Sequence, residues 1–213
     1  MSTRPIMAWQ AWLHQQRISN HMQITTEKLS KLAGWVADED SIKRPDGKFY
    51  SVIGVHVQDG EKWWDQPMIA EGSEGVAVLL TDGENFLLQA VAEPGNLHPT
   101  GSKVLLRPTL QSSRSHWHLE VPHRSELAKT ENAMVSVLAQ QDGSRFFFKQ
   151  VNLELQIIDE LEVWVIEHGD LKPNERIFSG RELSEAILAG ECNQFLRELA
   201  GLFWALGFGQ KTR

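Results

Sequence analysis

Four short segments of the sequence concentrate polar side chains that could bind a ligand or move a proton. Each carries polar side chains at positions where an ordinary strand would have regularly alternating apolar residues. In one of them Gln89 and Glu93 are four residues apart, so both side chains would lie on the same face of an extended strand. The segments are GKFYSVIGV (47–55), KWWDQPMI (62–69), LLQAVAEPGN (87–96) and RPTLQSSRSHW (107–117).

The last of these segments offers donors for an anionic ligand. Gln111 carries an amide, and Arg114 carries a guanidinium whose planar fork suits a diphosphate. Such a basic site would have to be local, because the chain has 21 basic and 28 acidic residues and a net charge of -7. That balance gives no reason to expect a nucleic-acid binder, and the scattered lysines and arginines form no patch for a membrane surface. The alternative is a solvated hairpin face with capping residues.

Three neighbouring histidines, His116, His118 and His123, raise the question of a metal site. Alternate residues of a strand face the same side, so His116 and His118 could bind one ion. No carboxylate has a convincing companion spacing, and the segment has no cysteine. These residues are more simply loop and surface histidines, and we expect no bound metal.

Other known chemistries are not indicated. The segment RELSEAILAG (181–190) partly matches a Nudix box, but the required glutamate pair falls on Glu185 and Ala186, and an upstream glutamate position is Pro173. A capping box followed by an amphipathic helix explains this segment. The motifs GxGxxG, GxxxxGK[ST] and GxSxG do not occur, so no cofactor is expected. The single cysteine, Cys192, cannot form a disulfide within the chain, and we interpret it as structural in a reducing cytoplasm.

The elements that must position these groups change in type along the chain. Apolar residues at helical spacing predict two short amphipathic helices over 8–18 and 26–36. Alternating patterns then predict strands, with hairpin turns at 82–83 and 142–143. Residues 94–122 have the composition of functional loops broken by short strands. The strands are expected over 48–57, 75–80, 86–93, 134–141, 145–158 and 161–167.

Helices return toward the C-terminal end. Ser179 and Glu182 form a capping-box pattern before one helix, and a second apolar helical pattern covers 192–206. Helices, then strands, then helices predict an α+β fold. Because no linker divides the chain, we expect one module over 41–213 preceded by a helical extension over 1–40. No run of about 18 apolar residues occurs, so no membrane span is expected.

Taken in order, the motifs FYSV, W-x-QPMI, QAVAEPGN and RPTLQSSRS resemble the NDP-hexose 2,3-dehydratases of deoxysugar biosynthesis. The patterns of that family run approximately FFSV, W-x-QP-I, QAK-EPGN and SPT-QATRSN, in the same order and at similar spacing over 47–117. The chain departs from them at Val91, where the family has lysine, and at His116, where it has asparagine.

The resemblance implies a Nudix-like mixed or antiparallel sheet flanked by helices. It also implies a lyase that removes water across C2 and C3 of a nucleotide-linked 4-keto-6-deoxyhexose, without a cofactor because no net redox change occurs. Glu93 would be the general base, and His116 the acid or an oxyanion donor. The alternative for Glu93 is a structural residue that caps the turn at Pro94 and Gly95 or pairs with Arg114. The residues expected to bind the substrate are Trp64, Gln66, Gln89, Asn96, Thr109, Gln111, Arg114 and Trp117.

The family normally carries two tandem copies of the module, whereas this chain has room for one. The resemblance therefore implies a homodimer that acts on a nucleotide sugar and needs neither nucleic acid nor membrane. Two alternatives remain open. One is a non-catalytic module that binds nucleotide sugars, and the other is a related enzyme of a biosynthetic cluster that acts on a different activated or keto substrate.

Overall fold

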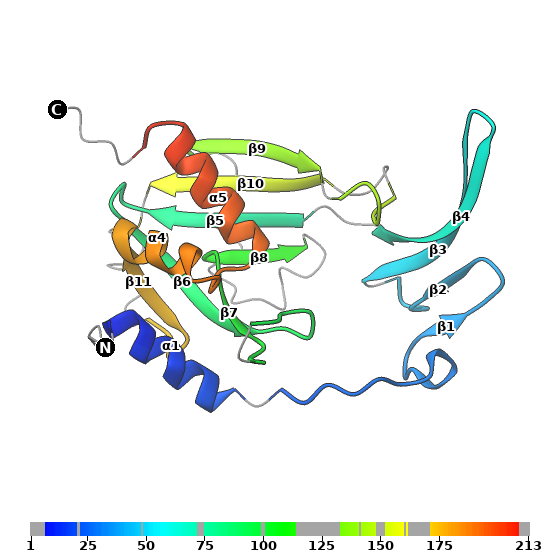
Figure 1. Cartoon of the computed structure of the whole chain (residues 1–213), viewed down its shortest axis with the longest axis horizontal. Coiled ribbons are helices and arrows are strands. Elements are labelled where there is room, and N and C mark those ends of the chain that lie inside the picture. Colours follow the sequence, from blue (N-terminus) through cyan, green and yellow to red (C-terminus); the bar gives the residue numbers. More distant parts are fainter. Residues whose placement is uncertain are drawn as a thin grey trace.

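A computed structural model of the chain contains two β-sheets, with three α-helices among the residues that it describes (Figure 1). The mixture of helices and strands confirms the predicted α+β class. None of the helices in this part of the chain is long and apolar enough to cross a membrane. The described residues are 7–20, 22–47, 49–71, 75–98, 101–113, 133–140, 142–147, 152–159, 161 and 171–208.

The larger sheet has seven strands in the order β11-β6-β5-β10-β9, with β7 paired to β6 and β8 paired to β5. β10 runs parallel to β5, whereas every other pair in this sheet is antiparallel. The strands are β5 (Gly75–Thr81), β6 (Asn85–Ala92), β7 (Val104–Arg107), β8 (Leu110–Ser113), β9 (Val135–Gln140), β10 (Asn152–Asp159) and β11 (Glu175–Ser179).

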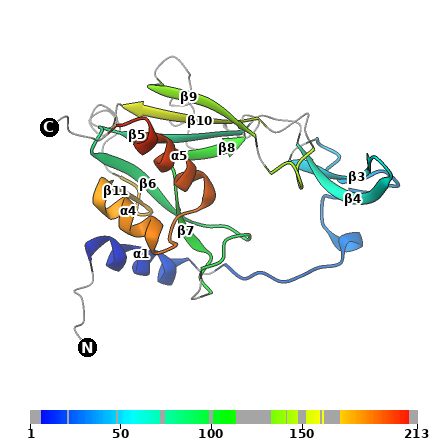
Figure 2. The same cartoon turned by 45° about the horizontal axis from the view of Figure 1, so that its top comes forward.

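This sheet is forked. β5 and β6 pair directly only beside their connecting turn, at Leu80–Leu87 and Thr81–Phe86, and then diverge. Beyond that point β7 pairs with β6 and β8 pairs with β5, so that the stretch 104–113 fills the fork (Figure 2). The fork matters for function because it brings the predicted QAVAEPGN and RPTLQ motifs onto neighbouring strands.

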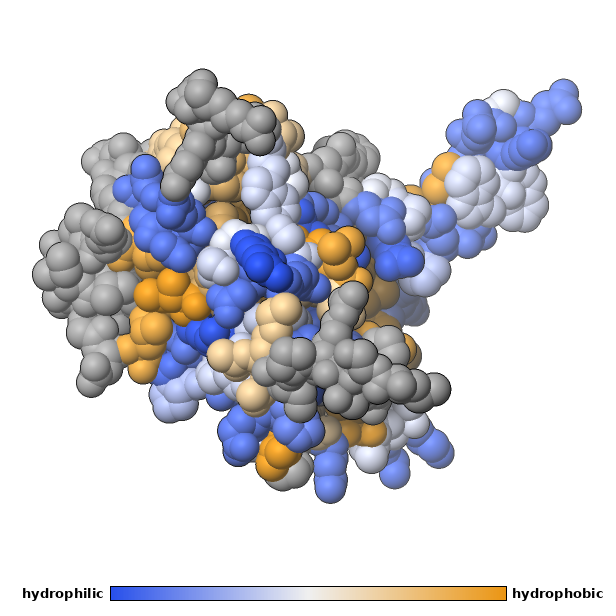
Figure 3. All heavy atoms as spheres, turned by 60° about the vertical axis from the view of Figure 1, so that its left-hand side comes forward, coloured by the Kyte–Doolittle hydropathy of each residue, from blue (hydrophilic) through white to orange (hydrophobic). Residues whose placement is uncertain are grey.

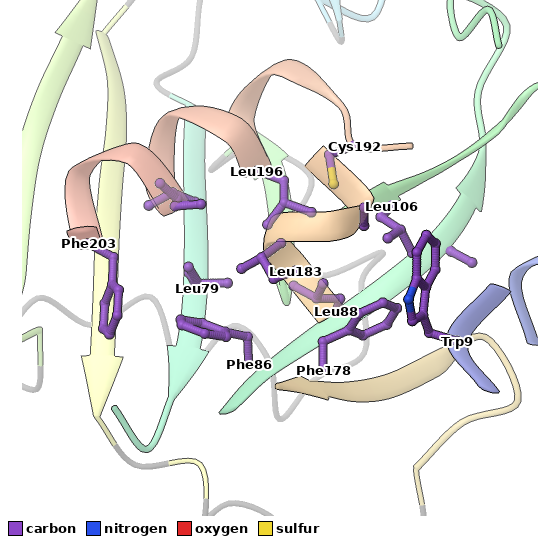
Figure 4. Packing of buried hydrophobic residues seen from close by; sticks show 14 of the residues in the cluster. Trp9, Leu79, Phe86, Leu88, Leu106, Phe178, Leu183, Cys192, Leu196 and Phe203 are labelled. Atoms are coloured by element: carbon purple, nitrogen blue, oxygen red, sulfur yellow. The ribbon is translucent and has the colours of Figure 1, made fainter. Parts of the chain in front are cut away.

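One face of the larger sheet, here called the helix-covered face, packs against all three helices (Figures 1 and 2). Figure 4 shows Leu183 and Phe203 from the helices close to the strand residues Leu79 and Phe86. It also shows Trp9 of the first helix beside Phe178. These side chains are almost completely buried, as the apolar stripe of an amphipathic helix requires. The helices are α1 (Ala8–Ser19), α4 (Gly180–Leu188) and α5 (Gln194–Ala205).

The other side of the larger sheet, here called the opposite face, has its own smaller apolar cluster. Val78 and Leu80 of β5 and Leu87 of β6 belong to it and are fully buried. Because successive strand residues point to opposite faces, residues such as Gln89 that continue the alternation from Leu87 also lie on this face.

The smaller sheet has four antiparallel strands in the order β1-β2-β3-β4 and stands out from the rest of the molecule (Figure 1). The end of its β3–β4 hairpin projects into solvent with mainly hydrophilic side chains (Figure 3). Its contact with the remaining chain includes a bridge between Ile69 and Phe146. The strands are β1 (Val36–Ala37), β2 (Ser41–Lys43), β3 (Tyr50–Asp59) and β4 (Lys62–Glu71).

Several predicted elements are confirmed. The turn at 82–83 forms, with Gly83 in the left-handed region at φ 86° and the Asp82 carboxylate accepting from the Asn85 backbone N–H. The capping box at the start of α4 also forms, because Ser179 and Glu182 each accept from the other's backbone N–H. The helix predicted over 192–206 is α5, whose first-turn N–H of Leu196 is capped by Asn193.

Two predictions about elements are wrong, one of them only in part. In place of a helix over 26–36 the chain has one 3₁₀ turn at Leu29–Lys31, followed by β1. Leu29 is 61% exposed, so the apolar side of this segment has no core to pack against, and a short isolated helix is then marginal. The strand predicted over 145–158 is wrong over the described residues 145–147, where Phe146 instead bridges to β4 of the other sheet, and is confirmed over 152–158, which belong to β10.

Four strands, β1, β2, β4 and β11, were not predicted, and one predicted strand falls largely outside the described residues. β11 consists of the short segment ERIFS, whose alternation of apolar and polar residues is too brief to indicate a strand. Of the strand predicted over 161–167, the structure describes residue 161 alone.

Candidate functional site

A row of three polar side chains crosses three strands on the opposite face of the larger sheet. Gln89 of β6 lies in register with Arg107 of β7 on one side and with Glu175 of β11 on the other. Directly paired residues share a face, so the three side chains lie together. Gln89 is 3% exposed and Glu175 6%, which is unusual for such polar groups.

The amide of Gln89 is held from both ends. Its oxygen accepts from Nε and Nη2 of Arg107 at 3.3 and 3.1 Å, and its Nε2 donates to the carbonyl oxygen of Thr109. Buried polar groups normally have such partners, because an unmade hydrogen bond is costly in the interior. Gln89 is therefore fixed in orientation by the motif RPTLQ on the neighbouring strands.

Thr109 lies where β5 and β6 separate. Its hydroxyl accepts from the backbone N–H of Leu80 at 3.0 Å and donates to the carbonyl of Leu87 at 2.6 Å. These are one backbone group from each of the two diverging strands, and Thr109 is fully buried. The threonine thus completes backbone hydrogen bonding at the point of divergence.

Glu93 lies immediately beyond the end of β6. Its backbone N–H donates to the carbonyl of Lys103 at 3.2 Å, and its own carbonyl accepts from the N–H of Asn96 at 3.0 Å. Its carboxylate lies 3.7 Å from Nη1 of Arg107 and is 32% exposed. The chain therefore presents a carboxylate with a fixed backbone, a cationic neighbour and access to a ligand.

Asn96 closes the turn that follows Glu93. Its side-chain Nδ2 donates to the carbonyl of Lys103 at 3.1 Å and to that of Val91 at 3.4 Å. Both contacts are with backbone, so in this conformation the amide nitrogen stabilises the connection from β6 to β7.

Gln111 lies on the helix-covered face. It is paired with the buried core residue Ala77 of β5, and its amide oxygen accepts from Nδ2 of Asn193 at 2.7 Å. Asn193 also caps α5 through the N–H of Leu196. Gln111 thus connects β8 to the start of a helix, away from the Gln89 row.

Trp64 and Gln66 lie on β4 of the smaller sheet, apart from the Gln89 row. The indole N–H of Trp64 donates to Gln66 at 2.8 Å, and Gln66 donates to the carbonyl of Ser144 at 3.1 Å. Trp64 is 43% exposed and so is available for stacking. Beside them His56 and Asp65 are in contact at 2.7 Å and line a shallow hollow of about 460 Å³.

The structure thus brings Gln89, Glu93 and Thr109 together and leaves Gln111, Trp64 and Gln66 elsewhere. The predicted residues Arg114, His116 and Trp117, together with His118 and His123, lie outside the described residues.

Arg107 and Glu175 were not among the predicted site residues. Arg107 opens the quoted RPTLQ motif, and this place in the motif could have indicated that its side chain matters. Glu175 lies on β11, which was not predicted, so no signal in the sequence indicated this residue.

The carboxylates of α4 are engaged in local contacts. Glu182 accepts from Arg176 at 2.8 Å as well as capping the helix, and Glu185 accepts from Arg181 at 3.0 Å. These contacts agree with the interpretation of 181–190 as a capped amphipathic helix.

Cys192 is buried in the core under the helices. Burial, and secondarily the neighbouring charge of Glu191, raises the pKa of its thiol to about 12. Since the thiolate is the nucleophile, this environment fits a structural residue.

Comparison with known proteins decides the family. A family model described as NDP-hexose 2,3-dehydratase matches residues 7–169, which is most of the chain. The chain belongs to this family. The match includes the segments that carry Gln89, Glu93, Arg107 and Thr109, and it extends to α1.

Two curated relatives carry the same printed name, dTDP-4-dehydro-6-deoxy-alpha-D-glucopyranose 2,3-dehydratase. The protein of Amycolatopsis orientalis is 27% identical over 176 residues, covering 72% of this chain and 36% of its own length. That of Streptomyces violaceoruber is 29% identical over 150 residues, covering 64% of this chain and 33% of its own length. The aligned part thus amounts to about a third of each of these dehydratases.

Proposed function

We propose that this member of the NDP-hexose 2,3-dehydratase family is a carbon–oxygen lyase acting on a nucleotide-linked 4-keto-6-deoxyhexose, with Glu93 as its general base. The observation that carries the proposal is the Gln89–Arg107–Glu93 arrangement, which lies in a chain of this family. The carboxylate is partly exposed, so a ligand can reach it, and its backbone is fixed on both sides.

The reaction needs a base but no redox partner. The C4 ketone acidifies the proton on C3, and Glu93 would remove that proton to give an enolate. The electron pair returns to expel the C2 hydroxyl, which leaves as water after protonation, and the enol left at C3 becomes a ketone. Substrate and product therefore differ by one water. We keep His116 as the proposed acid and Arg114 as the proposed ligand of the diphosphate. Trp64 or Trp117 is the residue proposed to stack on the nucleotide's base.

The test is turnover of dTDP-4-dehydro-6-deoxy-α-D-glucopyranose by the purified chain, followed as the loss of one water by mass spectrometry. Glu93→Gln keeps the shape of the side chain but cannot accept the proton, so it should lower turnover by about 10²–10⁴-fold. Its affinity for the nucleotide sugar should change little. Glu61→Gln, at an exposed position in the β3–β4 turn, is the matched control.

Normal turnover by folded Glu93→Gln would contradict the assignment of the base. Binding of the nucleotide sugar without turnover by the wild-type chain would contradict the lyase and indicate a binding module. Turnover of another keto substrate alone would indicate a related enzyme.

The remaining expectations are part of the same proposal. We propose that the forked sheet with its flanking helices is the Nudix-like module, that two copies of the chain associate, and that the protein works in the cytoplasm. In support of pairing, the smaller sheet exposes Trp63, Trp64 and Tyr50. Light scattering at micromolar concentration should give about twice the 24.2 kDa of one chain, and a strict monomer would contradict the dimer.

A further inference from the structure

The end of α1, the residues that follow it and the β6–β7 loop enclose a hollow of about 610 Å³. Figures 1 and 2 both show this end of α1 close to the loop that leads into β7. The polar side chains that line the hollow are those of His14, Arg17, Asn20, Gln23, Ser102 and Lys103. Its volume lies within the range of ordinary small-molecule sites.

The charge of this hollow differs from that of the whole chain. The chain has a net charge of -7, yet the described residues that line the hollow include the cationic side chains of Arg17 and Lys103 and none that is acidic. The ammonium group of Lys103 makes no ion pair or hydrogen bond within the described part of the chain, and the same holds for the ring of His14. Lys103 is half-buried, and its charge has no acidic partner among the described residues.

The wall of the hollow is held in place by a buried ion-pair cluster. Arg17 of α1 pairs with Glu191 through both Nη atoms, and Nε2 of His98 lies 3.3 Å from the same carboxylate. These side chains are only 10–18% exposed. They connect α1, the β6–β7 loop and the turn before Cys192, so the hollow does not have to assemble when a ligand binds.

Two further donors, from Ser102 and Gln23, line the same hollow as Lys103. The Ser102 hydroxyl accepts from the backbone N–H of Val104 at 3.1 Å, which leaves its own hydrogen available. The amide of Gln23 is exposed at the rim of the hollow. An ammonium, a hydroxyl and an amide around one space are the kinds of donor that phosphate oxygens accept.

One residue that lines the hollow, Lys103, is hydrogen-bonded to the backbone of the proposed base. The carbonyl of Lys103 accepts from the N–H of Glu93, so the two residues are opposite each other across the β6–β7 connection. Asn20 and Gln23 also line a second hollow of about 620 Å³, together with Val91 and Ala92, the two residues that precede Glu93 in the sequence. A ligand with its anionic group beside Lys103 would therefore extend along the end of β6.

We infer that this hollow binds the diphosphate of a nucleotide-linked ligand, with Lys103 as a cation that contacts it in addition to Arg114, which is already proposed for that role. The identity of the ligand rests on the proposed function, whereas the presence of a diphosphate site does not. Because the diphosphate is remote from the reacting carbons, Lys103 would contribute equally to the ground state and the transition state.

The experiment measures binding of dTDP and of inorganic pyrophosphate by calorimetry, using the whole chain. Lys103→Gln should weaken dTDP binding by about tenfold or more, and Lys103→Arg should keep most of the affinity. Lys28→Gln, at an exposed position, is the control and should bind as the wild type does. Circular dichroism verifies that each variant is folded.

Turnover then separates this inference from the proposed lyase. If both hold, Lys103→Gln raises KM about tenfold with kcat within about twofold of the wild type. Lys103-dependent dTDP binding without turnover supports the site and contradicts the lyase. Turnover with an unchanged KM and dTDP affinity in Lys103→Gln contradicts the site and leaves the lyase standing. Failure of the wild type to bind either probe at millimolar concentration also overturns the site.

Discussion

The guanidinium of Arg107 lies 3.7 Å from the carboxylate of Glu93, and two of its other nitrogens donate to the amide oxygen of Gln89. One cation on β7 therefore contacts two of the three polar side chains of the QAVAEPGN motif. Arg107 is 14% exposed and Glu93 32%, so this contact is more sheltered than an ordinary surface ion pair. We interpret Arg107 as a positioning residue for the proposed base.

Replacing Arg107 by methionine should affect both stability and turnover. The buried oxygen of Gln89 would lose its donors, so the free energy of unfolding should fall by about 1–3 kcal/mol. Glu93 would lose the group that orients it, so kcat should fall while KM changes little. Urea unfolding and steady-state kinetics measure the two effects separately.

Arg107→Lys is the conservative comparison for this experiment. Lysine keeps the charge beside Glu93 but cannot supply the planar pair of donors to Gln89. Turnover should therefore recover in part, while the stability loss mostly remains. Wild-type turnover in folded Arg107→Met would show that Glu93 does not depend on this contact.

Thr109→Val should be destabilising although it keeps the shape of the side chain. The buried N–H of Leu80 and the carbonyl of Leu87 would each lose a hydrogen bond at the fork, at a total cost of about 1–3 kcal/mol. Chemical denaturation checks this, with Thr25→Val at an exposed position as control. Thr109→Ser retains the hydroxyl and should be milder, and equal stability of Thr109→Val and wild type would contradict the structural role.

The sequence predicted elements where the local pattern and the tertiary packing agree. The helix after Ser179 has a capping box and an apolar stripe that meets the core, and it forms as expected. The segment 26–36 has the same kind of stripe, but no core lies beneath it, so the helix does not form. Local periodicity cannot distinguish these cases, because burial depends on residues far away in the sequence.

The candidate site shows the same limit. The shared face of Gln89 and Glu93 follows from strand alternation, which the sequence reveals. Their contacts with Arg107 and Thr109 depend on the fork, in which β7 pairs with β6 at a register that no local pattern encodes. The row through Glu175 also required β11, which was not predicted.

Chelation should leave any turnover unchanged. A Nudix-type metal site would need free carboxylates on α4, whereas Glu182 and Glu185 are in contact with Arg176 and Arg181. Turnover measured before and after EDTA treatment and desalting should agree within about twofold, which corresponds to about 0.4 kcal/mol in activation free energy. Activity lost with EDTA and restored by one divalent cation would contradict this prediction and would make His116 and His118 candidate ligands again.

Cys192 should resist alkylation in the folded protein. Its pKa is raised from 9.0 to about 12, mainly by burial, so at pH 8 the thiolate fraction is about a thousandfold lower than for an exposed thiol. Because the folded pKa is the higher one, the stabilising contribution of the neutral thiol is fully present below about pH 9. It is lost as the pH rises toward about 12, since the unfolded chain releases the proton first. Iodoacetamide labelling followed by mass spectrometry should therefore be slow at pH 8 in buffer and rapid in urea. Equal labelling rates in both conditions would show that Cys192 is accessible and ionised in the folded chain, which would remove the basis for treating it as structural.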